Sequence, residues 1–284
     1  MIPAYPPAGR APEAERKLRE AAQAGDADFA IGETALALSL AARPALDLSP
    51  YRAHLSEIAT SVAAEAQGKP DTIATRVMAL HNALVERLGY RGDRDTYDDL
   101  RNADLAHVID RRRGLPVSLA VLWIDAARAQ GWAAWGLSFP SHFLVRVDGP
   151  DGRAIVDPFN FGQALDTKAL RGLLKRLQGP DAELQAYHYA TVPDRTVLLR
   201  LQNNIKLRLM KGEDFRGALA VLERMLMLSP GDPALWHETG LVHGGLDNLR
   251  AAVMCLEQAA TLIEAPQARS RIAMEIQALK SRLN

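Results

Sequence analysis

The feature that most constrains the fold of this chain is a turn, rich in Gly, Pro and Asp, that separates two short apolar runs. The turn has the sequence DGPDG at residues 148–152, between the runs 143–147 and 154–156. Gly, Pro and Asp adopt the backbone angles of tight turns at low cost, so this arrangement predicts a β-hairpin. The two runs are therefore expected to pair as antiparallel strands.

A symmetric register for this hairpin makes a prediction about two polar side chains. Residue numbers that face each other would sum to 299, which sets His142 opposite Asp157. Opposed residues of an antiparallel pair have Cβ atoms about 4.5–5.5 Å apart, close enough for an imidazole to donate to a carboxylate. Such a pair is the orienting half of a nucleophile–His–acid triad. Structural roles remain open as well: a strand-end histidine for His142, and a turn-forming residue before Pro158 for Asp157.

The segment before the hairpin offers a third member of such a triad. Residues 116–130 are apolar nearly all round, which predicts a buried central helix, and Gly131 is placed to end it. Pro116 marks the first turn of this helix, and Ser118 lies in that turn. A hydroxyl there often satisfies free backbone amides, whereas a nucleophile there gains from the positive end of the helix dipole. Capping and nucleophilic attack are both open roles for Ser118.

Helices and strands are expected in separate blocks along the first part of the chain. Ala-rich and amphipathic patterns predict helices before the central one, and short apolar runs predict strands after it. This order is typical of an α+β domain in which helices pack on a small antiparallel sheet. The expected helices lie at 12–23, 29–42, 50–67 and 71–88, and the expected strands at 133–137, 143–147 and 153–156.

The last third of the chain repeats itself at an interval of 34 residues. Shifted by that amount, Ala218 falls on Ala252 and Leu222 on Leu256. This interval is the length of a tetratricopeptide helix pair, so an all-α repeat domain is expected. Two units are fewer than the usual three, and a last helix at 268–283 is expected to cap them.

These patterns divide the chain into a tail and two domains. Residues 1–12 have no apolar segment of the kind found in secretory signals, which favours a disordered tail. Residues 13–190 are expected to form the α+β domain, and residues 195–284 the helical repeats with their capping helix.

Charge and cysteine content exclude several classes of function. Lys plus Arg and Asp plus Glu both number 34, so the formal net charge is zero, and nucleic acid or an anionic membrane is not an expected partner. Cys255 is the single cysteine, which excludes an internal disulfide and favours a reducing, cytoplasmic location. No apolar stretch approaches the roughly 20 residues of a membrane span. No zinc spacing or Gly-rich phosphate loop occurs, so neither a metal nor a cofactor is expected.

Three motifs, taken in order, resemble one known family. They are RRRGLPVSL at 111–119, GLSFPSHFLVR at 136–146 and VDPFNFG at 156–162. They resemble the SirB-type bacterial family, in which a transglutaminase-like (papain-type) domain is followed by tetratricopeptide repeats. The resemblance extends from about residue 48 to about residue 264.

The resemblance implies a set of site residues and one departure from the family's chemistry. Transglutaminase-like enzymes use Cys as the nucleophile, and this region has none. The positional candidate is Ser118, with His142 and Asp157 as its catalytic partners. Residues on loops that a rigid sheet presents often line clefts, and a cleft is expected over this site. Its predicted lining is Pro116, Phe139, Pro140, Phe143, Pro158, Phe159 and Phe161.

Two hypotheses for function follow. In the first, which we favour, loss of the thiol has left a non-catalytic adaptor or regulator that binds a protein or peptide through its cleft and repeats. A hydroxyl must be deprotonated during attack, whereas Cys is already partly thiolate at neutral pH. In the second, Ser118, His142 and Asp157 form a working hydrolase or acyl-transferase that acts on a peptide, amide or ester.

Overall fold

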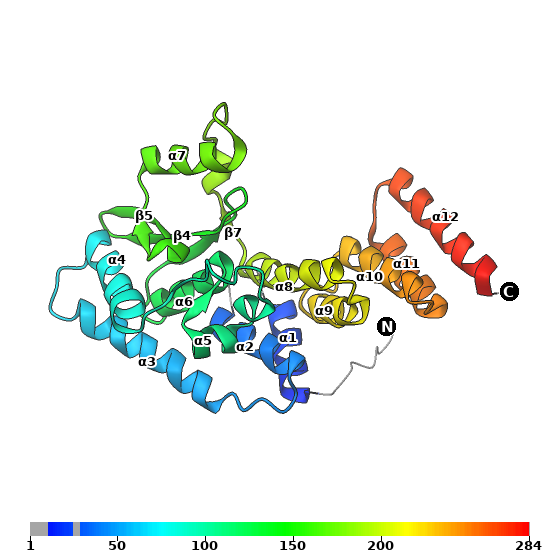
Figure 1. Cartoon of the computed structure of the whole chain (residues 1–284), viewed down its shortest axis with the longest axis horizontal. Helices are drawn as coiled ribbons and strands as arrows, with labels where there is room; N and C mark the ends of the chain where they lie inside the picture. Colours follow the sequence, from blue (N-terminus) through cyan, green and yellow to red (C-terminus); the bar gives the residue numbers. More distant parts are fainter. Residues whose placement is uncertain (1–10, 25–28, 284) are drawn as a thin grey trace. The chain divides into compact units, whose positions relative to one another are not determined.

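The chain forms two compact units in a computed structural model that describes residues 11–24 and 29–283 (Figure 1). One unit runs from Ala24 to Leu201, and the other joins α1 (Pro12–Gln23) to the residues from Gln202 onward. Residues 1–10 of the predicted tail lie outside the described residues, and α1 begins at Pro12, the last residue of that tail.

Helix α6 (Pro116–Arg128) is the centre of the first unit (Figure 1). The four consecutive residues 119–122 point to all sides of this helix, and each is at most 1 % exposed. A helix that is apolar all round is stable only when it is covered all round, and the prediction of a buried central helix is confirmed. The helices that pack on it are α2 (Ile31–Ala42), α3 (Ser49–Ala66), α4 (Ile73–His81), which continues into the π-helical turn η1 (Asn82–Arg87), and α5 (Leu105–Arg111).

An antiparallel sheet of five strands also packs on α6, with the strand order β6-β5-β4-β3-β7. Its three longer strands confirm the predicted strand runs, and its two edge strands have only two residues each. A separate parallel pair, β1 with β2, joins the loop before α5 to the start of α6. The strands are β1 (Arg91–Gly92), β2 (Arg113–Gly114), β3 (Ala134–Leu137), β4 (Leu144–Gly149), β5 (Gly152–Asp157), β6 (Gln163–Ala164) and β7 (Thr191–Val192).

The hairpin of β4 and β5 has a shorter turn than predicted. Val145 faces Val156, and only Pro150 and Asp151 separate the two strands. The predicted register was therefore wrong by two residues. Gly152 allows the tighter turn, because its φ of 152° is an angle that residues with side chains rarely adopt. Side chains alternate between the faces of a strand with a period of two, so this even shift leaves each one on its predicted face.

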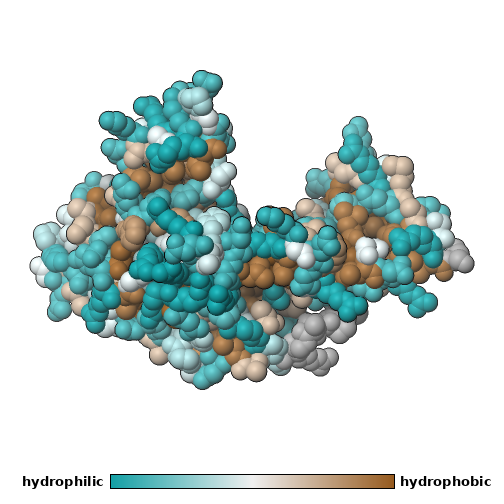
Figure 2. Space-filling view, in the orientation of Figure 1, coloured by the Kyte–Doolittle hydropathy of each residue, from teal (hydrophilic) through white to brown (hydrophobic). Residues whose placement is uncertain are grey.

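Helix α7 (Thr167–Gln178) packs on the same sheet, although no prediction placed a helix there. Its residues Leu170, Leu173 and Leu174 share one face and form a hydrophobic cluster with Leu137 and Leu144 of the sheet. Figure 2 shows hydrophobic surface between α7 and the strands beneath it, and hydrophilic surface over the top of the helix.

The second unit is built from paired helices, and the 34-residue interval is confirmed. Ala218 and Leu222 of one helix and Ala252 and Leu256 of its equivalent are all 0 % exposed. The last helix packs on the one before it, as a cap would. No helix among the described residues is long and apolar enough to cross a membrane. The helices are α8 (Asp194–Lys211), which begins in the first unit, α9 (Phe215–Leu228), α10 (Pro233–Gly245), α11 (Leu249–Leu262) and α12 (Pro266–Leu283).

Helix α1 belongs to the same unit, where it packs on α9. Ala14, Leu18 and Ala21 form its buried face, each at most 2 % exposed. This segment was predicted to belong to the α+β domain, at residues 13–190. The spacing of apolar residues shows which face of a helix is buried, but it does not identify the surface that covers that face.

Gly240 determines how closely α10 and α11 approach each other. A Cβ at this position would lie 2.8 Å from Cγ of Leu256 and 3.2 Å from the carbonyl oxygen of Ala252. We expect Gly240→Ala to lower the free energy of unfolding by about 1–3 kcal/mol, the usual cost of overpacking a tight contact. Urea denaturation measures this change. Gly245→Ala is the matched control, because nothing lies within 4 Å of a Cβ there. An equal loss in both variants would contradict the packing role of Gly240.

Candidate functional site

Two of the three predicted triad residues are in contact. Asp157 is the last residue of β5, and His142 lies before β4, directly after Ser141 with its positive φ of 54°. Nε2 of His142 is 2.9 Å from Oδ2 of Asp157. The predicted pair is present even though the register used to predict it was wrong, because the contact forms outside the ladder of paired residues.

The carboxylate of Asp157 is 2 % exposed and accepts hydrogen bonds on both oxygens. Oδ1 accepts from the backbone N–H groups of Phe159 and Asn160, at 3.1 and 3.2 Å, so Asp157 caps the 3-10 turn η3 (Pro158–Asn160). Oδ2 accepts from His142 and, at 2.5 Å, from Nδ2 of Asn160. Burial raises the pKa of Asp157, but the hydrogen bonds from His142 and Asn160 outweigh burial and hold the pKa below its usual value.

The pairing fixes the proton of the histidine ring. An ionised carboxylate can only accept, so Nε2 of His142 carries the proton in this contact. Nδ1 makes no hydrogen bond with any residue in the described part of the chain. The ring meets Phe159 edge-on, with centroids 6.1 Å apart, and the His142 side chain is 11 % exposed. Nδ1 is thus the atom through which this ring could act as a base.

Ser118 does not join the pair. Its hydroxyl lies 2.7 Å from the carbonyl oxygen of Asn102 and 3.0 Å from that of Leu115, and its one proton is directed to these two acceptors. The residue is 0 % exposed. Gly114 packs so closely that a Cβ on it would be 2.5 Å from Ser118 Oγ, which confines the hydroxyl further. The hydroxyl joins the first turn of α6 to the 3-10 turn η2 (Leu100–Ala103), and it is directed to that turn and to Leu115 and not to His142.

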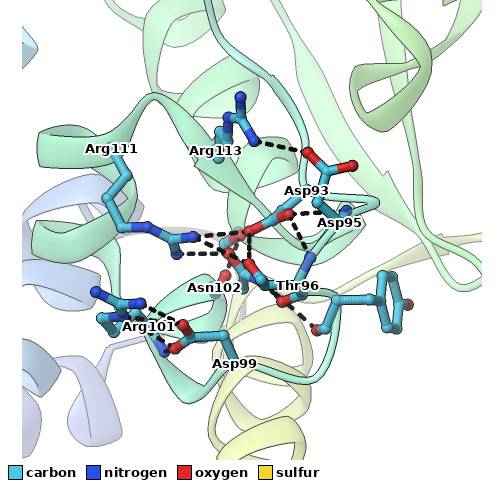
Figure 3. Close-up of polar contacts among 10 residues, drawn as sticks. Asp93, Asp95, Thr96, Asp99, Arg101, Asn102, Arg111 and Arg113 are labelled. Atoms are coloured by element: carbon cyan, nitrogen blue, oxygen red, sulfur yellow. Dashed lines mark hydrogen bonds and ion pairs between the residues drawn. The ribbon is translucent and has the colours of Figure 1, made fainter.

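Asn102, the acceptor of that hydroxyl, belongs to a buried polar network that the sequence analysis missed (Figure 3). Arg111 donates to Oδ1 of Asn102 at 2.8 Å and to Oδ2 of Asp93 at 2.7 Å. Asp93 is 0 % exposed and also accepts from the backbone and hydroxyl of Thr96, at 2.9 and 2.6 Å. Burial raises the pKa of Asp93, but the hydrogen bonds from Thr96 and Arg111 outweigh burial and hold the pKa well below its usual range. The network ties the loop that carries Asp93 and Thr96 to α5.

The same loop reaches the residues around the His142–Asp157 pair. Tyr97 meets Phe159 edge-on, with ring centroids 5.9 Å apart. Arg94 donates to Oδ1 of Asn160, and its guanidinium lies 5.9 Å from the centroid of Phe159. Phe159 therefore contacts the loop through Tyr97 and Arg94 and contacts the pair through His142. The Asp93 network and the His142–Asp157 pair are in this way parts of one continuous packing arrangement.

A cleft of about 390 Å³ opens beside the carboxylate of Asp157. It lies between η3 and β6 on one side and one face of α7 on the other. Asn160 and Gln163 contribute from the first side, and Ala169 and Gly172 from the helix.

The seven residues predicted to line a cleft lie elsewhere, and none of them lines this one. Phe139 and Phe143 are 0 % and 1 % exposed and belong to the core. Phe161, by contrast, is 52 % exposed. Of the remaining four, Pro116 and Pro158 are buried, and Pro140 and Phe159 are half-buried.

Removal of the Ser118 hydroxyl is expected to have a structural effect only. Ser118→Ala loses one buried hydrogen bond, while the Asn102 carbonyl keeps its bond from the backbone N–H of Leu115 at 3.1 Å. We expect the free energy of unfolding to fall by about 1 kcal/mol in urea denaturation. We also expect a thiol introduced as Ser118→Cys to react slowly with iodoacetamide, because the side chain is enclosed. Rapid alkylation of that thiol would contradict the enclosed, inward orientation of this side chain.

The thiol of Cys255, the single cysteine of the chain, is a second potential nucleophile. Cys255 is 1 % exposed, and burial raises the pKa of its thiol to about 11, so the reactive thiolate is scarce at neutral pH. Among the described residues, no group of three or more His, Cys, Asp or Glu side chains is placed to hold a metal ion.

Comparison with known families matches both parts of the chain. The family described as the transglutaminase-like superfamily matches residues 49–203. The family described as the tetratricopeptide repeat matches residues 205–284.

Similar proteins occur in several bacteria. A UPF0162 protein of Xylella fastidiosa is 36 % identical over 186 residues, which cover 64 % of this chain and 66 % of that protein. A UPF0162 protein of Vibrio cholerae is 30 % identical over 78 % of this chain and 82 % of its own length. A UPF0162 protein of Pseudomonas aeruginosa is 30 % identical over 87 % of this chain and 90 % of its own length. The match spans just under two thirds of the Xylella protein and most of the other two.

Proposed function

Because this chain belongs to the transglutaminase-like superfamily and to the bacterial UPF0162 family, we propose that it is a degenerate, non-catalytic member that acts as a protein-binding adaptor or regulator. The observation that carries the proposal is the engagement of Ser118 with the carbonyls of Asn102 and Leu115. A serine becomes a useful nucleophile only when a base lies within hydrogen-bond reach of its hydroxyl. Here the hydroxyl has other partners and no exposed surface.

The His142–Asp157 pair has a structural role that needs no chemistry. Asp157 caps η3, and the His142 ring packs on Phe159 of that turn. General-base help is worth typically ~10²–10⁴-fold, and a histidine supplies it only to a nucleophile that it can reach. We infer that the pair persists because it holds the turn in place.

Two surfaces of the chain support a role in protein binding. Tetratricopeptide repeats generally mediate protein interactions, and residues 205–284 match that family. The first unit adds the cleft beside Asp157. We place the protein in the cytoplasm, since a single buried cysteine suits a reducing compartment.

The proposal is tested by comparing the wild-type protein with His142→Ala in assays of hydrolysis and acyl transfer. The substrates are p-nitrophenyl esters, peptide amides, and a Gln-containing peptide with an amine acceptor. We expect no turnover above buffer from either protein. We also expect intact-protein mass spectrometry to show no adduct after treatment with a fluorophosphonate.

A second arm of the test concerns binding. A partner identified by crosslinking in cells should form a binary complex with the purified protein, and Ser118→Ala, which lies outside the cleft, should bind it as tightly as the wild type. Turnover that disappears in Ser118→Ala and in His142→Ala, with circular dichroism unchanged, would overturn the proposal in favour of a Ser–His–Asp hydrolase.

A further inference from the structure

We propose that the basic face of α7, together with the cleft beneath it, binds an acidic segment of a partner protein. This inference rests on the proposed function, because it assigns a chemistry to the partner that the first unit receives. It is carried by the charge of α7, by the shape of the cleft and by one glycine.

Helix α7 carries positive charge only. All four ionisable side chains of the helix are basic, namely Lys168, Arg171, Lys175 and Arg176, and all four residues are exposed. Lys175 lies 3.9 Å from a carboxylate oxygen of Glu183. The other three make no ion pair with any residue that the structure describes. The formal net charge of the chain is zero, so this local excess of positive charge is not a general property of its surface. Such a surface attracts negatively charged groups of a partner.

The cleft places two of these cations on either side of an apolar floor. Lys168 and Arg176 both line it, and they are two helical turns apart on one face of α7. Ala169 and Leu173 lie between them on that face, and Leu165 contributes from the segment before the helix. A volume of about 390 Å³ accommodates one or two side chains of a bound peptide. Cations at the rim and apolar surface at the floor fit a segment in which acidic and apolar residues are close together.

Gly172 is the residue that keeps this face open. Glycine in the interior of a helix costs about 0.5–1 kcal/mol relative to alanine. Nothing in the local backbone requires it, because Gly172 is not among the residues with positive φ. A Cβ at this position would meet only Nη1 of Arg176, at 3.5 Å. The glycine lines the cleft, so the effect of its missing side chain is a wider opening between Lys168 and Arg176.

The same cleft disfavours a nucleic acid. Asp157 and Asp166 both line it, and their carboxylates would repel closely spaced phosphates. The side-chain amides of Asn160 and Gln163 also line it and offer donors and acceptors to a peptide backbone. A peptide can direct its carboxylates to Lys168 and Arg176 and leave its uncharged backbone near the two side-chain amides. The backbone of a nucleic acid carries a phosphate at every step, so some phosphates would lie against the two aspartates.

The experiment measures fluorescence anisotropy of a fluorescein-labelled peptide of alternating Glu and Leu with the full-length protein. We expect binding that weakens as NaCl is raised, because salt screens the rim charges. We expect K168E/R176E to raise Kd at least about tenfold. Gly172→Leu should raise Kd similarly by filling the floor, with no loss of melting temperature because leucine favours the helix. The matched control is K69E/R153E, which makes the same charge change at exposed residues outside the cleft and should leave Kd unchanged.

Three results would overturn the inference: no binding of the Glu–Leu peptide by the wild type, equal losses in K168E/R176E and K69E/R153E, or equally tight binding of a peptide with Gln in place of Glu. Tighter binding of a DNA oligonucleotide with the same net charge would also overturn it, in favour of a polyanion surface. None of these results would decide whether the protein is non-catalytic, because that proposal is tested separately by the assays of turnover and of the binary complex. Conversely, turnover would overturn the proposed function and would not alter the measured Kd of the peptide.

Discussion

Replacement of Arg111 by Ala is expected to lower the free energy of unfolding by about 3 kcal/mol. The guanidinium of Arg111 lies 2.7 Å from the carboxylate of Asp93, which is 0 % exposed. Its removal leaves that charge buried without its charged partner, although the Thr96 hydroxyl still donates to it. Breaking a buried pair costs about 3–5 kcal/mol, and the low end applies because the Arg111 side chain is 21 % exposed. Urea denaturation followed by circular dichroism gives the value.

Arg101→Ala is the matched control for this prediction. Arg101 also pairs with an aspartate of the same loop, Asp99, at 2.6 Å, but its side chain is 55 % exposed. Water replaces the lost partner there, so we expect little change in the unfolding midpoint. Should the two arginine variants lose the same stability, the buried network would have no special role in holding the loop.

Replacement of Asp157 by Ala is expected to lower the free energy of unfolding by about 2–3 kcal/mol. The change removes the acceptor of two backbone N–H groups, of the His142 ring and of the Asn160 side chain. Each buried donor left without a partner costs about 1–3 kcal/mol, and water in the adjacent cleft reduces the total. Urea denaturation measures the loss. Nitrogen chemical shifts of the His142 ring should report a mixture of tautomers in place of the Nε2–H form.

Asp166→Ala provides the comparison. Asp166 lines the same cleft and accepts one hydrogen bond, from the backbone N–H of Ala169 at 2.7 Å, as the N-cap of α7. Loss of an ordinary N-cap costs about 1 kcal/mol. If Asp157→Ala lowers the free energy of unfolding by no more than Asp166→Ala does, the hydrogen bonds from His142 and Asn160 do not stabilise the fold.

Local patterns in the sequence predicted a large part of this architecture. The apolar run of α6, the hairpin and the 34-residue interval depend on periodicity within one or two neighbouring elements, and all three were predicted. The contact of His142 with Asp157 also follows from local geometry, since only 15 positions separate the two residues. The register was wrong because the tight turn needs only Pro150 and Asp151.

The orientation of Ser118 depended on information that no local pattern carries. Its acceptor is a backbone carbonyl 16 positions earlier, and that carbonyl is placed by the network of Asp93 and Arg111. Every residue has a backbone carbonyl, so a sequence pattern does not single one out. The basic face of α7 was likewise missed, although its leucines at helical spacing were a usable signal.

The packing of α1 on α9 has a consequence for how the protein is made. The two helices are separated by about 190 residues of chain, and synthesis at roughly 5–20 residues per second delays the second by about 10–40 s. During that interval the apolar face of Ala14, Leu18 and Ala21 has no native partner. The early helix must therefore remain uncovered on the ribosome, or be held by a chaperone, until the repeats emerge to receive it.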